Sequence, residues 1–326
     1  MTEGRTDRIA TIDIGTNTVL LLVAERTGNG SLRAVEEHAT ITRLGQGVDE
    51  TRTLHPDAIA RTGACLDAYG AIVKRLGVTH VAVVGTSAMR DARGSEVIAE
   101  HIRKTFGVEL RVIGGDEEAE LTFAGALVGL AEAVPGQELV VFDIGGGSTE
   151  VVRGTLDDTG AVRSIGYKKS FDVGSVRLTE RHVRSDPPSA GELDAIRAQL
   201  HATFSTLAGD VGAHARPAMV PIGIAGTVTT LAAVAMKMET YDATRVHGHH
   251  LTTRALRGVV EHLASLPLAV RREVPGLEPK RADVIVAGGL VALALLEHLG
   301  AESLVISDRG VRWGLAVALS RSAATL

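Results

Sequence analysis

Two segments of this chain, 130 residues apart, repeat one short pattern of residues. The first reads Asp13-Ile-Gly-Thr-Asn-Thr18, and the second reads Asp143-Ile-Gly-Gly-Gly-Ser-Thr-Glu150. Each lies between two runs rich in β-branched and apolar residues, and a third such run and then helical patterns follow in both halves. A repeat of this kind indicates that one structural unit is duplicated. We therefore expect an α/β fold with two mixed sheets covered by helices, whose equivalent turns face one another across a cleft.

The periodicity of the apolar residues predicts the elements of both halves. In the first half it predicts helices over 55–76, 94–105 and 116–133, and strands over 8–14, 18–24, 32–44, 80–84 and 109–113. In the second half it predicts strands over 139–144, 149–153, 162–170, 218–224 and 303–306, and helices over 190–208, 227–238, 252–265, 281–299 and 310–319. We place one domain at residues 1–120 with a returning C-terminal helix at 307–326, and the other domain at 121–306.

Composition narrows the classes of protein that fit. Lys and Arg number 34 against 39 for Asp and Glu, so the formal net charge is −5, and aromatic residues make up only 3%. A broad basic face and base-stacking platforms are not expected, so we predict no nucleic-acid partner. The single cysteine, Cys65, excludes an internal disulfide and a multi-cysteine zinc site, and it favours a reducing cytoplasm. The longest uncharged stretch, 217–236, contains two prolines and two glycines, which favours a buried strand, a turn and a buried helix over a membrane span.

The two repeated segments have the composition of phosphate-binding loops. Glycines permit sharp turns that expose successive N–H groups, and hydroxyl donors are added by Thr16, Thr18, Ser148 and Thr149. A leading Asp beside phosphates commonly holds Mg²⁺, directly or through water. Two ordinary hairpin turns are the alternative, but two matching copies favour phosphate binding. The sequence contains neither the Walker nor the Rossmann phosphate-binding motif after a strand.

Two strand-to-helix turns supply further candidate phosphate ligands. The segment Gly85-Thr-Ser-Ala-Met-Arg-Asp91 places Arg90 near the start of a helix, where anions bind well. A capped helix with a surface arginine explains this segment equally well. The second turn contains Gly226 and Thr227.

The acidic residues at the start of another helix have two interpretations. In Gly114-Gly-Asp-Glu-Glu-Ala-Glu120, Asp116 can cap the helix, and the helix dipole favours the acidic residues that follow. Alternatively, one of the glutamates lies in the cleft and activates water as a general base. Periodicity does not choose between the two. The segment His247-Gly-His-His250 lacks the spacing and partners of a zinc site, so no metal is predicted there.

Taken in order, the motifs of this chain resemble those of the exopolyphosphatase / guanosine pentaphosphate phosphatase family, a branch of the actin-like phosphotransferase superfamily. The resemblance runs nearly from end to end. The segments that carry it are 12–17, 43–45, 85–92, 115–119, 143–150, 174–180, 226–227, 281–285 and 307–312.

The resemblance implies two ribonuclease-H-like domains with the active site between them. It implies that Glu118 is the catalytic base and that Arg90 contacts phosphate. Asp143 and Glu150, with Asp13 nearby, are the implied ligands of a divalent metal, Mg²⁺ or Mn²⁺. A homodimer is implied as well. The phosphate-binding positions expected from the loops and the resemblance together are Thr16, Asn17, Thr18, Gly145, Gly146, Gly147, Ser148, Gly226 and Thr227.

Two positions depart from the pattern of the family. Many relatives have Asn two residues after the segment Arg90-Asp-Ala92, where this chain has Arg93 followed by Gly94. Many also have Glu in the closing motif, where this chain has Trp313. Both departures concern the surface that binds the substrate chain, while the expected base and phosphate loops are intact.

We predict a cytoplasmic exopolyphosphatase that removes terminal orthophosphate from linear inorganic polyphosphate, with water activated by Glu118. Hydrolysis of the 5′-phosphate of guanosine pentaphosphate (pppGpp) is the alternative, because both reactions remove a terminal phosphoryl group with the same machinery. A further alternative is an actin-like ATPase or sugar kinase, with adenosine bound at the turn 225–227 or at Gly288-Gly289. A non-catalytic polyphosphate sensor is disfavoured, because Glu118 and both loop aspartates are present.

Overall fold

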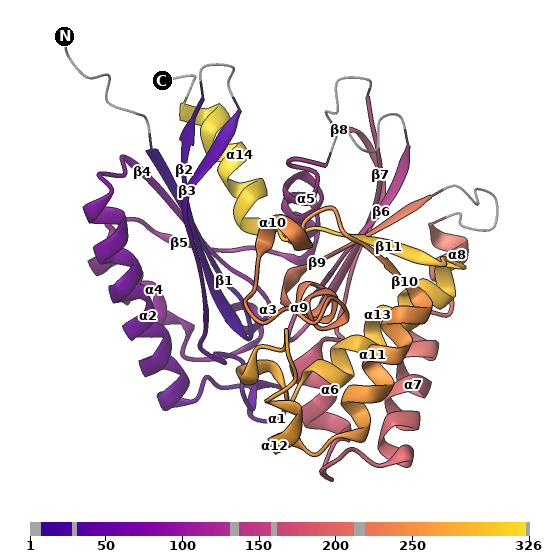
Figure 1. The fold of residues 1–326 in the computed structure, drawn as a ribbon. Helices are drawn as coiled ribbons and strands as arrows, with labels where there is room; N and C mark the ends of the chain where they lie inside the picture. Colours follow the sequence, from indigo (N-terminus) through magenta and orange to yellow (C-terminus); the bar gives the residue numbers. More distant parts are fainter. Residues whose placement is uncertain (1–7, 28–30, 131–136, 158–161, 212–218, 324–326) are drawn as a thin grey trace. The chain divides into compact units, whose positions relative to one another are not determined.

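The chain forms two units, each with a sheet and a hydrophobic core of its own (Figure 1). The structure is a computed structural model that describes residues 8–27, 31–130, 137–157, 162–211 and 219–323. Unit 1 consists of residues 1–125 and 311–326, and unit 2 of residues 126–310. The boundaries expected from the sequence, after residues 120 and 306, lie five and four residues before these.

Unit 1 is built on a five-stranded mixed sheet, in the spatial order β3 (Leu32–Ile41), β2 (Thr18–Arg26), β1 (Arg8–Ile14), β4 (His80–Gly85) and β5 (Leu110–Val112). Strands β1, β2 and β3 pair antiparallel, whereas β1, β4 and β5 run parallel. Strand β1 is buried over nearly its whole length, because both faces of the sheet are covered. Apolar residues therefore stand on both faces of β1, with Ile9 on one and Ala10, Ile12 and Ile14 on the other, and all five strands lie where they were predicted.

The helices of unit 1 are α1 (Val48–Thr51), α2 (Pro56–Arg75), α3 (Ser87–Asp91), α4 (Ser95–Phe106), α5 (Gly115–Ala126) and α14 (Val311–Ala323). Helices α2 and α4 share one hydrophobic core with one face of the sheet. Helix α14 returns from the C-terminal end to the other face (Figure 1), where Val311 and Leu315 pack on Val84 and Ile113. Helices α1 and α3 are four and five residues long, too short for the periodicity that predicted the longer helices.

Unit 2 repeats this arrangement in a six-stranded sheet, in the order β10 (His250–Thr252), β11 (Ser303–Ile306), β9 (Val220–Ile224), β6 (Glu138–Ile144), β7 (Thr149–Leu156) and β8 (Val162–Phe171). Strands β6, β7 and β8 pair antiparallel, and β6, β9 and β11 run parallel. The order β8-β7-β6-β9-β11 is therefore that of β3-β2-β1-β4-β5 in unit 1. Strand β10 is an addition to the repeat, paired antiparallel with β11.

The helices of unit 2 are α6 (Ser175–His182), α7 (Ala190–Phe204), α8 (Leu207–Asp210), α9 (Ala225–Ala235), α10 (Ala243–Val246), α11 (Thr253–Ser265), α12 (Leu268–Arg271), the 3₁₀ helix η3 (Pro279–Arg281) and α13 (Ile285–Leu299). Helix α13 is apolar on nearly all sides and lies in the core. Strand β9 and helix α9 account for the described part of the long uncharged stretch, as predicted. Among the described residues, no helix is both long enough and apolar enough to cross a membrane.

Helix α13 corrects one expectation from the sequence. Gly288-Gly289 was a candidate strand-to-helix turn, but both residues lie inside this helix. A Cβ atom on Gly288 would lie 2.6 Å from Cγ2 of Thr227, and one on Gly289 would lie 2.4 Å from Cγ2 of Val260. The two glycines therefore let α9 and α11 pack closely against α13, which pattern alone does not distinguish from a turn.

Candidate active site

The first repeated segment forms the turn between β1 and β2, and its carbonyl groups bind the segment that follows β3. The carbonyl oxygen of Thr16 accepts a hydrogen bond from the N–H of Gly45 at 2.8 Å. The carbonyl oxygen of Asn17 accepts from the N–H groups of Thr42 and Arg43, at 3.1 and 3.0 Å. A Cβ atom on Gly45 would lie 2.2 Å from Cγ2 of Thr16, so this position needs glycine.

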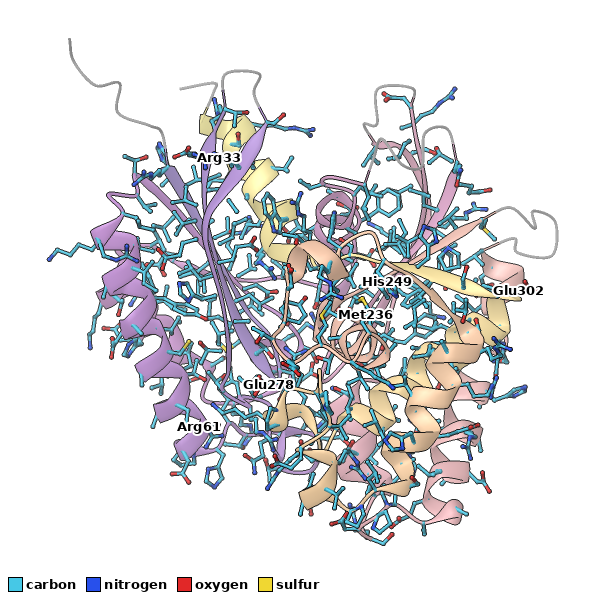
Figure 2. All side chains as sticks on the ribbon, in the orientation of Figure 1. Arg33, Arg61, Met236, His249, Glu278 and Glu302 are labelled. Carbon is cyan, nitrogen blue, oxygen red and sulfur yellow. The ribbon has the colours of Figure 1, made fainter. Side chains whose placement is uncertain are left out.

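Helix α2 also binds the segment that follows β3, residues 42–46, through Arg61. Nε of Arg61, which is labelled in Figure 2, donates to the carbonyl oxygen of Thr42 at 2.8 Å. Its Nη2 reaches Oε1 of Gln46 at 3.4 Å. The segment 42–46 is thus held between α2 and the turn.

The second repeated segment, between β6 and β7, is arranged in the same way. Its Gly145 carbonyl oxygen accepts from the N–H of Ser175 at 2.9 Å, and that of Gly146 accepts from Val176 at 2.9 Å. These donors are the first N–H groups of α6, so the loop of unit 2 provides the hydrogen-bond acceptors for the start of this helix. A Cβ atom on Gly174 would lie 2.5 Å from the carbonyl oxygen of Gly146, which is why the chain has glycine before this helix.

Within the two loops, the N–H groups of Gly15 and Gly145 donate to the carbonyl oxygens of Thr18 and Ser148, at 3.0 and 3.1 Å, and other N–H groups have no backbone acceptor. No backbone carbonyl of the described residues accepts from Thr16 or Asn17 in unit 1, nor from Gly146, Gly147 or Ser148 in unit 2. Successive main-chain N–H groups in a turn are a common binding arrangement for anions. Phosphate binding by the two loops stays a prediction.

Two predicted hydroxyl donors are used within unit 2 instead. Oγ1 of Thr149 donates to the carbonyl oxygen of Val173 at 2.6 Å, and Oγ1 of Thr227 donates to that of Ile144 at 3.0 Å. A hydroxyl has one proton to donate, so in this conformation both side chains stabilise the ends of strands.

Asp143 and Glu150 occupy directly opposed positions on β6 and β7. Residues paired in this way have Cβ atoms about 4.5–5.5 Å apart on the same face of the sheet. Glu150 is only 1% exposed, and its Oε1 accepts a hydrogen bond from Oγ of Ser170 at 2.6 Å. Two opposed carboxylates repel each other unless a cation or a proton lies between them.

These two carboxylates fit Mg²⁺ better than a metal that needs a full protein cage. Mg²⁺ prefers oxygen donors and is often held by one or two carboxylates, with water and substrate phosphates completing its shell. Among the described residues, no cluster of three or more His, Cys, Asp or Glu side chains forms a metal cage. Asp143 and Glu150 therefore have the oxygen donors that such a site would need, and metal binding by them stays a prediction.

The repeat is asymmetric at this point. In unit 1, the residue opposed to Asp13 is Leu20, whereas in unit 2 the residue opposed to Asp143 is Glu150. Asp13 is 8% exposed at the end of β1. The pair of carboxylates is thus a property of unit 2, and the participation of Asp13 in the same metal site remains a prediction.

Glu118 is the buried residue among the acidic residues that begin α5. It is 6% exposed, whereas Asp116 and Glu120 are exposed and Glu117 pairs with Arg111. Arg90, in the last turn of α3, brings Nη1 within 3.3 Å of Oε2 of Glu118. The same Nη1 donates to the carbonyl oxygen of Ile113 at 2.9 Å. The structure therefore distinguishes Glu118 from its neighbours, which the sequence did not, and brings the predicted base and the predicted phosphate arginine together.

The turn at the start of α9 is occupied by an arginine from η3. A Cβ atom on Gly226 would lie 1.3 Å from Nη1 of Arg281, so the guanidinium lies directly against this glycine. The contact of the same Nη1 with Oγ1 of Thr230 is 3.5 Å long. Burial lowers the pKa of Arg281 from its usual value. Gly226 is needed here to admit Arg281.

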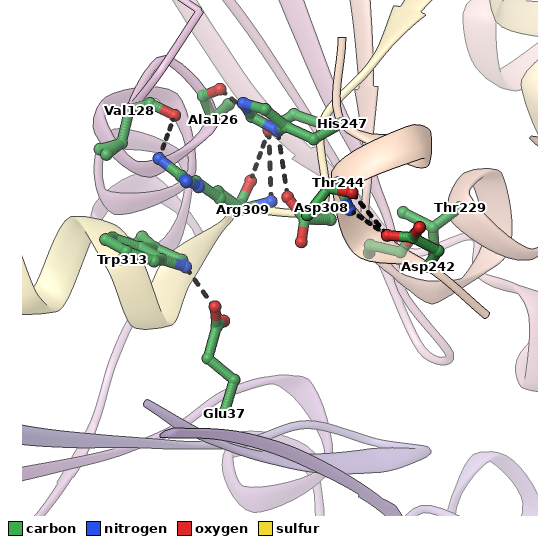
Figure 3. A network of polar contacts seen from close by, with 12 residues as sticks. Glu37, Ala126, Val128, Thr229, Asp242, Thr244, His247, Asp308, Arg309 and Trp313 are labelled. Carbon is green, nitrogen blue, oxygen red and sulfur yellow. Dashed lines mark hydrogen bonds and ion pairs between the residues drawn. The ribbon is translucent and has the colours of Figure 1, made fainter. Parts of the chain in front are cut away.

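The two departures from the family pattern have local explanations. Gly94 precedes α4 with φ of 93°, in the left-handed region that glycine and asparagine adopt most readily. Trp313 is 1% exposed in α14, and its Nε1 donates to Oε2 of Glu37 at 3.2 Å (Figure 3). Both residues therefore have structural roles within unit 1.

A hollow of about 200 Å³ between α7, α11 and α13 contains none of the predicted site residues. Apolar side chains of the three helices form much of its wall, and His201 and His298 lie at its edge with ring centroids 5.2 Å apart. Neither of the two loops that are predicted to bind phosphate contributes to it, so this hollow is not part of the candidate active site.

The chain belongs to the Ppx/GppA phosphatase family, whose profile matches residues 22–323. It is 36% identical to a Mycobacterium tuberculosis protein named exopolyphosphatase 2, over 96% of this chain and 98% of that protein. A Vibrio atlanticus protein named guanosine-5′-triphosphate,3′-diphosphate pyrophosphatase is 28% identical over 94% of this chain and 58% of its own length. The crystal structure of an exopolyphosphatase-like protein superimposes with a TM-score of 0.90 at 31% identity, covering 98% of this chain and 99% of that one. The α/β fold with two mixed sheets is thus the fold of this family.

Sequence reasoning missed Ser170 as the hydrogen-bond donor to Glu150. The two residues are opposed across β7 and β8, 20 positions apart. The strand register would have been the signal, but a bulge in this pair of strands hides the register from a pattern of alternation.

Proposed function

We propose that this protein is an exopolyphosphatase, a phosphoric anhydride hydrolase that releases orthophosphate from the end of linear inorganic polyphosphate. The observation that carries the proposal is the matched pair of loops, in which carbonyl groups are bound within each unit and N–H groups remain for an anion. The M. tuberculosis relative, similar over nearly its whole length, is named for this activity. Nucleic acids and membranes are not among the proposed partners.

We further infer that both units have the ribonuclease-H-like fold of the actin-like superfamily. Each contains three antiparallel strands followed by two parallel strands, in the spatial order 3-2-1-4-5. In this interpretation the two phosphate loops occupy equivalent places in the two units, at the first β-turn.

Glu118 would act as the general base of the reaction. Its carboxylate is buried and Arg90 holds one of its oxygens, so its position is defined before substrate binds. In the proposed step, Glu118 accepts the proton of the attacking water while loop N–H groups bind oxygens of the terminal phosphoryl group. Arg90 would contact phosphate once the substrate is present.

Asp143 and Glu150 are the residues that would hold Mg²⁺ or Mn²⁺, with Asp13 as a proposed third ligand. A bound divalent cation would neutralise the charge of the transferring phosphoryl group. The two carboxylates themselves would orient the cation relative to the 145–148 loop, and Ser170 would fix the carboxylate of Glu150.

Hydrolysis of pppGpp is the second candidate function, and the V. atlanticus relative is the observation in its favour. An actin-like ATPase or sugar kinase is less well supported. Arg281 occupies the space over Gly226, and Gly288-Gly289 lies within α13, so neither proposed adenosine turn offers an open glycine surface. A non-catalytic sensor would not require a buried carboxylate at position 118.

Rates with three substrates test the proposal. We expect kcat/KM to be higher with long-chain and with short-chain polyphosphate than with pppGpp, all at one Mg²⁺ concentration. EDTA should abolish phosphate release, and added Mg²⁺ or Mn²⁺ should restore it. A clear preference for pppGpp would replace the first candidate with the second, and transfer from ATP to an acceptor would favour a kinase.

A homodimer and a cytoplasmic location complete the proposal. The homodimer is supported by the family resemblance, and the location by the single, buried cysteine, Cys65. Light scattering of the purified protein would test the oligomeric state.

A further inference from the structure

His247 is the centre of a polar cluster that follows α10 in unit 2 (Figure 3). Its Nδ1 lies 3.0 Å from Oδ1 of Asp308 and 3.4 Å from Oγ of Ser307. Both the imidazole and the carboxylate are largely buried, with 15% and 13% of the side chains exposed. A carboxylate at this distance accepts a hydrogen bond, so the proton of a neutral His247 belongs on Nδ1.

The arrangement is not that of a catalytic triad. A triad places the serine at Nε2 and the carboxylate at Nδ1, whereas here Ser307 and Asp308 both approach Nδ1. Nε2 of His247 is buried, and no group among the described residues hydrogen-bonds to it. A Cβ atom on Gly129 would lie 3.3 Å from Nε2, so backbone closes this side of the ring. His247 is therefore placed to hold Asp308 and not to activate a nucleophile.

The segment 307–310, which follows β11, is held at several points besides His247. Ser307 donates through its N–H to the carbonyl oxygen of Gly223 at 2.9 Å, and through Oγ to that of Ala126 at 2.9 Å. Arg309 donates through Nη1 to the carbonyl oxygen of Val128 at 2.8 Å. The path of this segment is thus determined by main-chain and side-chain hydrogen bonds within unit 2.

The anchored segment ends beside the carboxylate of Asp143. A Cβ atom on Gly310 would lie 4.0 Å from Oδ2 of Asp143 and 2.8 Å from Cδ1 of Ile224. Ile224 is the residue paired with Asp143 in the adjacent parallel strand. Gly310 therefore packs on the same face of the sheet as the carboxylate that we assign to the metal.

We propose that His247 is a positioning residue for Asp143, acting through Asp308 and the segment 307–310. This inference rests on the proposed function only in assigning the divalent metal to Asp143. Asp143 faces Glu150 across the strands, and repulsion between the two carboxylates favours their separation. In this proposal the backbone of the segment 307–310 forms a wall at Gly310, and this wall limits how far the side chain of Asp143 can turn away from Glu150. Loss of His247 leaves Asp308 buried without this partner, so the wall shifts.

Mn²⁺ binding without substrate tests the inference separately from turnover. We expect His247→Ala to weaken Mn²⁺ binding, measured by electron paramagnetic resonance, by about 10–100-fold, as is typical when a residue that supports a metal ligand is lost. His247→Asn keeps a donor near the position of Nδ1, so it should bind Mn²⁺ more tightly than the alanine variant. His298→Ala is the matched control, since His298 is a half-buried histidine of the same unit beside the 200 Å³ hollow.

Gly310→Ala perturbs the same wall from its other end. The added methyl group would displace the side-chain end of Ile224, a small change that permits folding, and it should also weaken Mn²⁺ binding. Circular dichroism establishes that each variant is folded; if His247→Ala is not, His247→Asn and Gly310→Ala decide. Normal Mn²⁺ affinity in the folded His247 and Gly310 variants would overturn the inference.

Asp143→Asn distinguishes the proposed metal site from the proposed positioning role of His247. If this variant binds Mn²⁺ as the wild type does, the proposed metal site itself is wrong. If it binds Mn²⁺ weakly while the His247 and Gly310 variants bind normally, only the positioning role is wrong. The metal concentration that gives half of the maximal rate should change in parallel with the binding data.

Discussion

At the scale of single residues, burial distinguishes Glu118, the proposed base, from several similar side chains on the same helix. Its neighbours on α5 are exposed or paired with surface cations, whereas Glu118 is buried next to Arg90. The arginine lies 28 positions earlier in the chain, at the end of a different helix. Burial and a fixed partner make Glu118 a defined acceptor for a proton, which a solvated carboxylate is not.

Glu118→Gln removes the proton acceptor but keeps the shape of the side chain. We expect kcat for polyphosphate hydrolysis to fall by about 10²–10⁴-fold, because a general base contributes about that factor, while polyphosphate binding is largely kept. Glu117→Gln is the control on the same helix, since Glu117 pairs with Arg111 at the surface, and it should leave kcat unchanged. Near-normal turnover by Glu118→Gln would remove this residue from the mechanism.

At the scale of elements, the 145–148 loop takes its shape from the start of α6. Its carbonyl groups accept the first N–H groups of that helix, and Gly174 lies in contact with the loop backbone. Both partners at this contact are main-chain atoms, so no side chain can move aside to relieve the steric clash that a larger residue at position 174 would cause.

Gly174→Ala should therefore disturb the 145–148 loop, the proposed phosphate-binding loop. The new Cβ atom would lie 2.5 Å from the carbonyl oxygen of Gly146, so we expect a loss of about 1–3 kcal/mol in the free energy of unfolding. A displaced loop should also lower kcat/KM by about 10²-fold. Gly258→Ala, at an open and exposed position of α11, should instead stabilise the protein by about 0.5–1 kcal/mol at unchanged kcat/KM. Equal behaviour of the two variants would contradict this account of the loop.

Helix α7 begins with a capping box whose stability depends on pH. Hydrogen bonds from the hydroxyl of Ser185 and from the N–H groups of Ser189 and Arg184 lower the pKa of Glu192 to about 2. An unfolded chain has a Glu pKa of about 4.3, so ionised Glu192 stabilises the fold above that pH. This contribution is lost as the pH falls from about 4 towards 2.

Glu192→Gln removes the charge from the capping box. We expect the variant to be less stable than the wild type at pH 6, in urea unfolding, and the difference to shrink by pH 3. A difference in the free energy of unfolding that is the same at both pH values would show that the charge of Glu192 is not responsible.

At the scale of the whole molecule, the chain completes unit 1 only with its C-terminal helix. Helix α14 packs on β1 and β2, although the whole of unit 2, residues 126–310, separates it from the rest of unit 1 along the chain. Trp313 is the largest of its fully buried side chains, and Arg312 binds Glu37 of β3 at 2.8 Å. Unit 1 therefore depends on a segment that is synthesised after unit 2.

Trp313→Ala should destabilise the protein by about 3–5 kcal/mol, because it leaves a large cavity and removes the hydrogen bond to Glu37. Urea unfolding followed by far-ultraviolet circular dichroism measures this loss. Arg321→Ala, at an exposed position of the same helix, should change the free energy of unfolding by less than about 0.5 kcal/mol. A comparable loss in both variants would mean that α14 contributes through its ends and not through the buried indole.

The sequence by itself determined the duplication, the positions of the strands along each half and the family, and it located the two repeated turns, whose phosphate binding stays a prediction. These follow from local patterns: alternation or continuous burial in a strand, the period of a helix, and glycine with small polar residues at a turn. Because each pattern is read within a few neighbouring residues, it does not need the rest of the fold. The same limitation explains why Gly288-Gly289 was taken for a turn, since the pattern of small residues is shared by turns and by closely packed helices.

Only the tertiary structure decided which acidic residue of α5 is buried, that Ser170 holds Glu150, and that His247 holds Asp308. His247 and Asp308 are 61 positions apart, and they meet because β11 passes the end of α10. Whether such a contact stabilises the protein, and by how much, depends on burial and on partners that packing brings together from distant parts of the chain. A local sequence pattern does not show which distant residues become neighbours in space, so this part of the site could be recognised only in the folded molecule.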